Sequence, residues 1–274
     1  MYKFSENHHY LMPAHFGPYK EHLCGYEGAP IAATYRDVSM IVVTYETEWQ
    51  ALERYIPEPF EVKEPVISVS FNMNQNVEWM AGGTYKLVAV DVPVIYDYAG
   101  QHLEGSFSLV VWESKATPCY PGREVMGIPK IFADIEDFHH LGERMFSHAS
   151  YEGVSFLEIE ALKKRKLSAD EVAAVNQDME KAPFNWFGWR YIPNIGKPGA
   201  ALSHATLFPQ EIIFSDLYEC EGKISWNAVT HEQNPTQAHI INALGRLPIK
   251  ASRACYVSIG GTSHLRSDLA RQLP

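Results

Sequence analysis

One lysine of this 274-residue sequence lies in unusually apolar company. In the stretch GREVMGIPKIFADI, residues 122–135, Lys130 follows Pro129 and precedes Ile131 and Phe132. Burial disfavours an ammonium ion, so a lysine that is kept dry has a lowered pKa and offers a free amine near neutral pH. Such an amine attacks a ketone to form a Schiff base, whose iminium draws electrons from the neighbouring carbon. Composition alone favours the ordinary interpretation, in which Lys130 lies on an edge strand with its amine in water.

Other residue types that can do chemistry show weaker patterns. The 12 histidines have neither the helical i, i+4 spacing nor the cysteine partners of a zinc site, so we expect no metal. No G-x-S-x-G motif marks a serine nucleophile. Cys119 lies near Arg123, but nothing else favours a thiolate there, and a structural thiol is expected. The glycine pair in SIGGTS, residues 258–263, fits a turn better than a phosphate-binding loop.

The composition is that of an ordinary soluble protein, with 46% hydrophobic and 20% charged residues. A net charge of −10 argues against nucleic acid as a partner, because phosphate binding needs a clustered basic surface. The 4 cysteines are widely spaced, which favours free thiols in a reducing compartment. No signal segment and no apolar run of roughly 20 residues is present, so we expect a cytoplasmic protein without a membrane partner.

The elements that must position Lys130 are mostly strands. Segments rich in β-branched and aromatic residues, punctuated by Gly, Pro, Asn and Asp, recur from residue 38 onward. Three helices are predicted: one after Thr47 as N-cap, one at residues 168–181 with a capping box formed by Ser168 and Glu171, and one at residues 263–273. The pattern predicts a single domain over residues 1–274, mainly antiparallel β, with an irregular N-terminal arm at residues 1–37 and a barrel or sandwich beyond it.

Five motifs resemble landmarks of the acetoacetate decarboxylase family and occur in the family's order. They are GPYK at residues 17–20, YETEWQALERYIPEPFEV at 45–62, GRE…PK at 122–130, FNWFGWRYIPN at 184–194 and LPIKASRACYV at 247–257. No single motif is very specific, but five in order are, and they extend over most of the chain. The resemblance implies that Lys130 occupies the position of the family's Schiff-base lysine. It also implies a cone-like antiparallel β-barrel with peripheral helices and an interior pocket, assembled into a homo-oligomer.

The sequence departs from the family at several polar positions. A second lysine, which in the decarboxylases follows the nucleophile and helps to lower its pKa, is replaced by Ile131. Two family carboxylates correspond to Leu87 and Ser70, and the family's N-terminal arginine has only an approximate counterpart in Arg36. We therefore expect the pKa of Lys130 to be lowered by exclusion of water rather than by a neighbouring charge.

The resemblance and the remaining polar residues assign roles to eight positions. Beside the Lys130 nucleophile, the phenols of Tyr85 and Tyr256 and the carboxylate of Glu124 are candidate acid/base groups. The candidates for substrate binding are Arg36, Arg123, Met126 and Trp79. Aromatic residues that face the interior would favour a substrate larger than acetoacetate; those considered are Trp79, Trp112, Phe184, Trp186 and Trp189.

The resemblance predicts a carbon–carbon lyase that forms a Schiff base with a β-keto acid or a related carbonyl compound and uses no cofactor. Decarboxylation and aldol reaction with dehydration both stay open, because some divergent relatives that resemble the decarboxylases are aldolase-dehydratases that keep the lysine and use tyrosines. A non-catalytic binder of a hydrophobic ketone or polyketide-like ligand is a further alternative. A last one is an isomerase that relies on Tyr85, Tyr256 and Glu124 and does not need the lysine.

Overall fold

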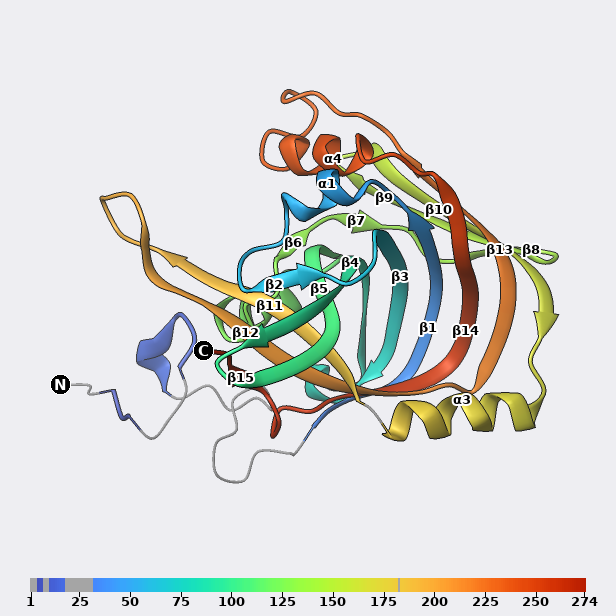
Figure 1. Cartoon of the computed structure of the whole chain (residues 1–274), viewed down its shortest axis with the longest axis horizontal. Helices are drawn as coiled ribbons and strands as arrows, with labels where there is room; N and C mark the ends of the chain where they lie inside the picture. The colour runs from blue at the N-terminus through green and yellow to red at the C-terminus, as the bar shows by residue number, and fades with distance from the viewer. Residues whose placement is uncertain (1–3, 7–9, 18–31, 182) are drawn as a thin grey trace.

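Seven long strands form a closed ring at the centre of the molecule (Figure 1). The computed structural model describes residues 4–6, 10–17, 32–181 and 183–274. In ring order the strands are β12 (Ala200–Ile213), β11 (Phe184–Pro193), β5 (Gln101–Glu113), β4 (Gly83–Tyr98), β3 (Val66–Val77), β1 (Ala33–Glu46) and β14 (Ala251–Leu265). Antiparallel pairing of β12 with β14, from Gln210 opposite Leu265 to Ile213 opposite Thr262, closes the ring.

The same sheet continues from β14 into a curved extension. Its strands are β13 (Asp216–Trp226), β10 (Val154–Lys166), β9 (Arg144–Tyr151) and β7 (Asp134–Ile135), and four short strands join it or the ring: β2 (Phe60–Val62), β6 (Lys130–Phe132), β8 (His139–Leu141) and β15 (Arg271–Gln272). All pairings are antiparallel except those of β5 with β6 and with β11. The predicted fold class, mainly antiparallel β with few helices, is confirmed.

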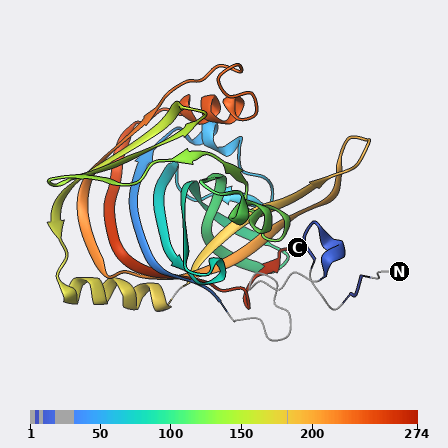
Figure 2. The same ribbon diagram turned by 180° about the vertical axis from the view of Figure 1, so that it is seen from behind.

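The described part of the chain contains four α-helices. They are α1 (Trp49–Glu53), α2 (Ala116–Glu124), α3 (Ala169–Lys181) and α4 (Ala238–Gly245), and two 3₁₀ turns, η1 (Ala14–Phe16) and η2 (Glu78–Met80), accompany them. Figures 1 and 2 both show α3 along one end of the ring, with α1 and α4 at the opposite end. Among the described residues, no helix is both long and apolar enough to cross a membrane.

The prediction for α3 is confirmed at its capping box, the first predicted helix is present but starts one residue later than expected, and the last predicted helix is wrong. Ser168 and Glu171 exchange backbone-to-side-chain hydrogen bonds of 2.8 and 3.3 Å. The first helix begins at Trp49 with Glu48 as its N-cap, and Thr47 instead donates its backbone N–H to the carbonyl of Pro65, just before β3. The last helix predicted, at residues 263–273, is replaced by the end of β14, a turn and β15, since strand pairing there overrides the regular leucine spacing.

The glycine pair of SIGGTS and the N-terminal arm also differ from expectation. Residues 258–263 lie inside β14, where Gly260 has φ of 72° at an irregularity in the pairing with β1, so no turn forms. Strand β1 begins at Ala33, inside the segment predicted as an irregular arm. Most of the GPYK motif and Cys24 fall outside the described residues, whereas Cys119, Cys220 and Cys255 are free thiols.

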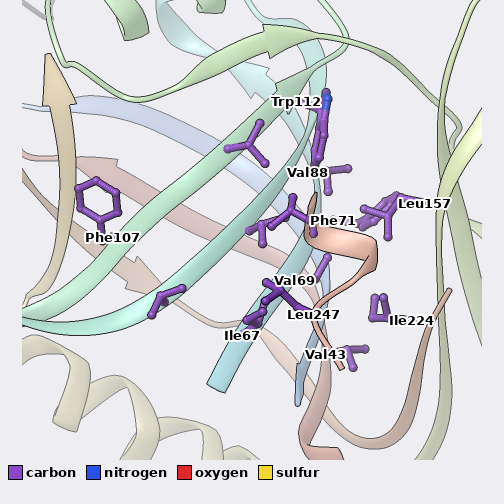
Figure 3. Packing of buried hydrophobic residues seen from close by; sticks show 14 of the residues in the cluster. Val43, Ile67, Val69, Phe71, Val88, Phe107, Trp112, Leu157, Ile224 and Leu247 are labelled. Atoms are coloured by element: carbon purple, nitrogen blue, oxygen red, sulfur yellow. The ribbon is translucent and has the colours of Figure 1, made fainter. Parts of the chain in front are cut away.

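Alternation along the central strands gives the sheet one apolar face and one cavity face. Ile41, Val43, Ile67, Val69, Phe71, Val88 and Val90 belong to the large hydrophobic core, together with Trp112 from β5 (Figure 3). The residues between them point the other way, because successive side chains of a strand face opposite sides. On β3 these alternate residues are Ser68, Ser70, Asn72 and Asn74, and on β4 they are Tyr85, Leu87, Ala89 and Asp91.

Candidate active site

The cavity face encloses a space of about 350 Å³ inside the ring. Its walls come from β1, β3, β4, β12 and β14, and residues of α2 and α3 help to enclose it. The serines and asparagines of β3 form a polar part of the wall. The residues paired with them on the neighbouring strand β1 are apolar: Val38, Met40 and Val42. The cavity is therefore suited to an organic molecule with one polar edge and an apolar carbon chain.

Lys130 lies in the wall of this cavity with only 6% of its surface exposed. It is the first residue of β6 and pairs with Val111 of β5. Helix α2 packs directly on its side chain, and a Cβ atom added at Gly122 would overlap the carbon atoms of the lysine. The Arg123 guanidinium donates a hydrogen bond of 2.8 Å to the backbone carbonyl of Lys130. The conformation of the lysine is therefore fixed from both its stem and its backbone.

A buried carboxylate, Glu113, is the partner of the Lys130 amine. The two side chains are 2.6 Å apart between Nζ and Oε1, and Glu113 is fully buried at the end of β5. Within the described part of the chain, neither Glu113 oxygen receives a hydrogen bond from any other residue. Lys130 is thus the polar partner of Glu113 within the described chain.

The ion pair decides the ionisation of both groups. Burial is the largest single influence and lowers the pKa of Lys130, but the charge and hydrogen bond of Glu113, together with Tyr35 and Cys119, outweigh it and leave that pKa raised. Burial likewise raises the pKa of Glu113, and the nearby ammonium only partly offsets this. The expectation that dryness alone lowers the lysine pKa is therefore wrong for the resting protein, because it left out Glu113.

Two tyrosines lie close to this pair. Tyr35 and Tyr85 both line the cavity, with ring centroids 6.3 Å apart. Burial, followed by the charges of Tyr35 and Glu113, raises the pKa of Tyr85 well above its ordinary value. Tyr85 is therefore a neutral phenol that can donate a hydrogen bond but does not act as a phenolate.

A second polar centre lies elsewhere in the cavity, around Asp91 of β4. The Trp186 indole donates a hydrogen bond of 2.6 Å to Ser108 Oγ, and the Ser108 hydroxyl donates one of 2.5 Å to Asp91 Oδ1. Burial raises the pKa of Asp91 to about 7 in spite of these hydrogen bonds. Tyr256 faces the same region, and burial together with the Asp91 charge raises its pKa to about 12.

The register of the sheet relates these groups to one another. Lys130 pairs with Val111, Val111 with Ala89, and Ala89 with Ser70. The same row continues through Val42 of β1 to Tyr256 of β14. Lys130 and Tyr256 thus lie at the two ends of one row of paired residues that runs across the curved sheet.

Asn74 adds an unused hydrogen-bond donor to the cavity wall. It is 5% exposed and lies opposite Tyr85 in the pairing of β3 with β4. Its amide nitrogen has no hydrogen-bond partner among the described residues. An unpartnered buried amide costs free energy, and a bound oxygen atom would satisfy it.

Five of the eight residues selected from the sequence line the cavity: Lys130, Tyr85, Tyr256, Met126 and Trp79. The other three do not. Arg36 is exposed and paired with Glu78, Arg123 holds the Lys130 backbone, and Glu124 interacts with Arg190. We therefore leave Glu124 out of the acid/base groups and Arg36 and Arg123 out of direct substrate binding. Of the aromatic residues considered, Trp79, Phe184 and Trp186 line the cavity, whereas Trp112 lies in the hydrophobic core.

Sequence reasoning missed Glu113, Asp91 and Asn74. Glu113 ends the strand-like run SFSLVVWE, and Asp91 interrupts the apolar run VAVDVPV. An acidic residue inside a strand that is otherwise apolar on both faces is a usable signal, because such a carboxylate must find a partner or a polar cavity. No group of three metal-ligating side chains occurs within the described ranges of the chain.

Comparison with known proteins identifies the family. A family model described as acetoacetate decarboxylase (ADC) matches residues 11–264. An acetoacetate decarboxylase from Burkholderia mallei is 33% identical over 94 residues, which cover 34% of this chain and 35% of that protein. The matched segment thus spans about a third of the length of that curated relative.

Solved structures share the fold. The structure of acetoacetate decarboxylase from Legionella pneumophila superimposes with a TM-score of 0.71 and 20% identity, covering 89% of this chain and 88% of that one. The enduracididine biosynthesis enzyme MppR in complex with pyruvate gives a TM-score of 0.66 and 14% identity, covering 91% and 93%. Because the family model spans nearly all of the ring and its extension, the chain belongs to the acetoacetate decarboxylase family.

Proposed function

We propose that this protein is a carbon–carbon lyase in which the Lys130 amine forms a Schiff base with a β-keto acid or a related carbonyl compound. The observation that carries the proposal is the placement of Lys130 in the wall of an enclosed cavity, 2.6 Å from a buried carboxylate that can take its proton. Membership of the family supports the same assignment. The substrate is a small carbonyl compound, and no metal or organic cofactor enters the scheme.

Glu113 supplies the proton acceptor that the nucleophile needs. Transfer of one proton from Lys130 to Glu113 converts the ion pair into a neutral amine and a neutral carboxylic acid without changing the charge of the site. Burial penalises both charged forms, so the neutral pair lies closer in free energy here than in water. The amine then adds to the substrate carbonyl, and Glu113 returns its proton as the carbinolamine loses water. The product of these steps is an iminium ion beside the Glu113 carboxylate.

The iminium is the electron sink for breaking a carbon–carbon bond. With a β-keto acid, the electrons of the bond to the carboxylate move toward the iminium nitrogen, carbon dioxide leaves, and an enamine forms. A proton from water, to which the Tyr85 phenol can donate a hydrogen bond, returns to carbon, and the hydroxide left behind adds to the iminium, so that hydrolysis releases the ketone and restores Lys130. The amide of Asn74, opposite Tyr85 on the neighbouring strand, is placed to donate to a substrate oxygen during these steps.

Aldol reaction with dehydration is the second candidate function. Asp91 and Tyr256 favour it, because both line the cavity and provide acid/base groups apart from the Lys130–Glu113 pair. MppR, which shares the fold, has also been solved with the condensation product of pyruvate and imidazole 4-carboxaldehyde. In this chain the enamine formed from a keto acid such as pyruvate would attack an aldehyde, and a nearby acid would assist loss of water.

Borohydride trapping tests the step that both candidates share. The protein is incubated with a methyl ketone, reduced with borohydride and digested, and we expect the mass of the reduced adduct on the peptide that contains Lys130. Lys86 is a matched control, since it lies on a neighbouring ring strand but pairs with Asp137 at the surface. Absence of an adduct on Lys130, or equal labelling of Lys86, would rule out the proposal.

Two assays then separate the candidates. Carbon dioxide release from a panel of β-keto acids reports decarboxylation, and condensation of pyruvate with aldehydes reports aldol chemistry. Lys130→Ala should abolish either activity. Ligand binding without turnover in both wild type and Lys130→Ala would instead identify a binding protein, and substantial residual turnover in that variant would identify lysine-independent chemistry.

A further inference from the structure

Asp91 is a cavity carboxylate that the proposed Schiff-base steps do not use. Among the described residues, the charged side chains that line the cavity are Lys130 and Asp91. Lys130 is neutralised by Glu113, whereas no cation among the described residues pairs with Asp91. A carboxylate inside a cavity without a cationic partner is costly, so its presence needs a physical reason.

Two described side chains are hydrogen-bond partners of Asp91. Oδ1 accepts a hydrogen bond from the Ser108 hydroxyl, and Ser108 Oγ accepts one from the Trp186 indole, which also interacts with the carboxylate itself. A carboxylate has about four acceptor sites, so these two partners leave it able to accept a further hydrogen bond from the cavity. Ser108 and Trp186 are both buried, so their positions are set by packing. The carboxylate is therefore oriented by its neighbours while retaining an acceptor that faces the enclosed space.

The register of β4 sets how far Asp91 lies from the reacting amine. Ala89 shares the row of Lys130, and the amine reaches toward Glu113, which pairs with Leu87. Asp91 is thus two to four residues away along β4, which corresponds to roughly 7–14 Å of strand. Acetoacetate is too short to touch both centres, whereas a longer carbonyl compound can bridge them.

We propose that Asp91 is a specificity-determining residue, which binds a hydroxyl or ammonium group at the far end of an elongated carbonyl substrate. The inference rests on the proposed function only in placing the carbonyl at Lys130. An apolar chain between the two ends would lie against Met40, Val42 and Phe214, which line the cavity. Tyr256, whose phenol stays protonated, is placed to donate to an oxygen at the same end.

The test compares matched ligands in wild type and in Asp91→Asn. The ligands are methyl ketones of five to eight carbons, each as the unsubstituted, ω-hydroxy and ω-amino form, and their dissociation constants are measured by calorimetry. Asparagine keeps the shape and can still accept from Ser108, but it presents an N–H donor to the cavity instead of an acceptor. A matched control is Asn72→Ala, which changes another polar cavity residue nearer the Lys130 end.

Above pH 7, where Asp91 is ionised, one chain length is expected to bind to the wild type at least about tenfold more tightly with a terminal donor than without one, as for a hydrogen bond to a charged group. Asp91→Asn should remove that advantage and leave the affinity for the unsubstituted ketone unchanged, whereas Asn72→Ala should preserve the advantage. The hydroxy and amino arms show which donor is preferred. The proposal is overturned if no ligand chain length binds to the wild type more tightly with a terminal donor than without one. It is also overturned if that advantage is as large in Asp91→Asn as in the wild type.

Calorimetric binding does not require a covalent bond, so this result is separable from the Schiff-base proposal. Borohydride trapping is run on the same ligands. A donor preference that depends on Asp91, with no adduct on Lys130, would refute the Schiff base and leave the specificity role in place. An adduct on Lys130 without any donor preference would support the Schiff base and refute the specificity role of Asp91.

Discussion

Lys130 and Glu113 form a buried ion pair in which the carboxylate lies close enough to the amine to accept its proton directly. Both are buried, and within the described chain Glu113 has no other polar partner. A lysine with a raised pKa is a poor nucleophile unless its proton has a destination close by, and the carboxylate provides one at 2.6 Å. The second lysine that the resemblance led us to look for is replaced by Ile131, and the structure supplies a negative partner where the family has a positive neighbour.

Glu113→Gln should make Lys130 reactive at lower pH. Without the carboxylate, burial is the main influence on the amine and depresses its pKa, so we expect the midpoint of its pH profile to fall by at least about one pH unit. The measurement is pulse labelling with acetic anhydride at a series of pH values, read by peptide mass spectrometry. Lys86 serves as the internal control, and an unchanged Lys130 profile would mean that Glu113 does not control its ionisation.

At this scale the sequence could predict Lys130 but not its partners. The lysine lies within a motif whose order along the chain resembles a family, and its apolar neighbours are adjacent in sequence. Glu113 and Asp91 reach the site through strand pairing, which single-sequence patterns do not specify. Glu124 is the opposite case, since it is close to Lys130 in sequence but interacts with Arg190 outside the cavity lining.

Helix α3 is the element that helps to close one end of the ring. Met179 lines the cavity, and Val172, Val175 and Met179 pack against residues of β1. Asn176 joins the helix to the turn after β12, because its amide both donates to the carbonyl of Phe214, at 2.9 Å, and accepts from the Phe214 N–H, at 2.8 Å. This bidentate contact holds the helix against the body of the protein.

Asn176→Ala should loosen α3. The substitution leaves both backbone groups of Phe214 without their partner, and we expect the free energy of unfolding to fall by about 1–3 kcal/mol. Limited proteolysis should also cut the connection between α3 and β11 more rapidly. Asp178→Ala, a change at an exposed position of the same helix, should have little effect on either measurement. Equal behaviour of the two variants would show that the Asn176 contact does not anchor the helix.

Helices were predictable where a local signal determines them. The capping box of Ser168 and Glu171 is formed by residues three apart and survives unchanged in the fold. The regular spacing of Leu265, Leu269 and Leu273 was misleading, because Leu265 and Leu273 are buried by strand pairing whereas Leu269 is 40% exposed. A period of four residues indicates a helix only when all members face one side.

The whole molecule buries carboxylates in addition to apolar surface, and this makes its stability depend on pH. Asp91 has a pKa of about 7 in the folded protein and near 3.8 when unperturbed. Between these values the unfolded chain releases its proton while the folded chain keeps it. The folded state binds more protons there, so this group's contribution makes the free energy of unfolding fall as pH rises from about 4 to 7. Above pH 7 the loss is complete.

Asp91→Asn should remove this contribution. We expect the stability of the variant relative to wild type to increase between pH 4 and pH 8, by up to roughly 4 kcal/mol, since each pKa unit corresponds to about 1.4 kcal/mol. Urea unfolding of both proteins at each pH measures the difference, and contributions from other carboxylates cancel in the comparison. Parallel stability curves for the two proteins would contradict the assignment of a raised Asp91 pKa.

The arrangement of the whole sheet was only partly predictable. Alternating patterns and turn residues indicate many antiparallel strands, and the resemblance supplies a barrel. The closing contact of β12 with β14 and the parallel entry of β6 beside β5 join segments that are distant along the chain. Such pairings depend on complementary surfaces that exist only after folding.

The pairing of β1 with β14 has a consequence for how the protein is made. These strands lie near opposite ends of the described chain, yet they pair along their whole length, from Ala33 opposite Leu265 to Glu46 opposite Ala251. On the ribosome, β1 and Lys130 emerge long before β14 does, and the cavity cannot close in the meantime. Until the cavity closes, Lys130 is therefore an ordinary hydrated ammonium group of the nascent chain. The buried environment of Lys130 can form only after β14, the last ring strand in chain order, has been synthesised.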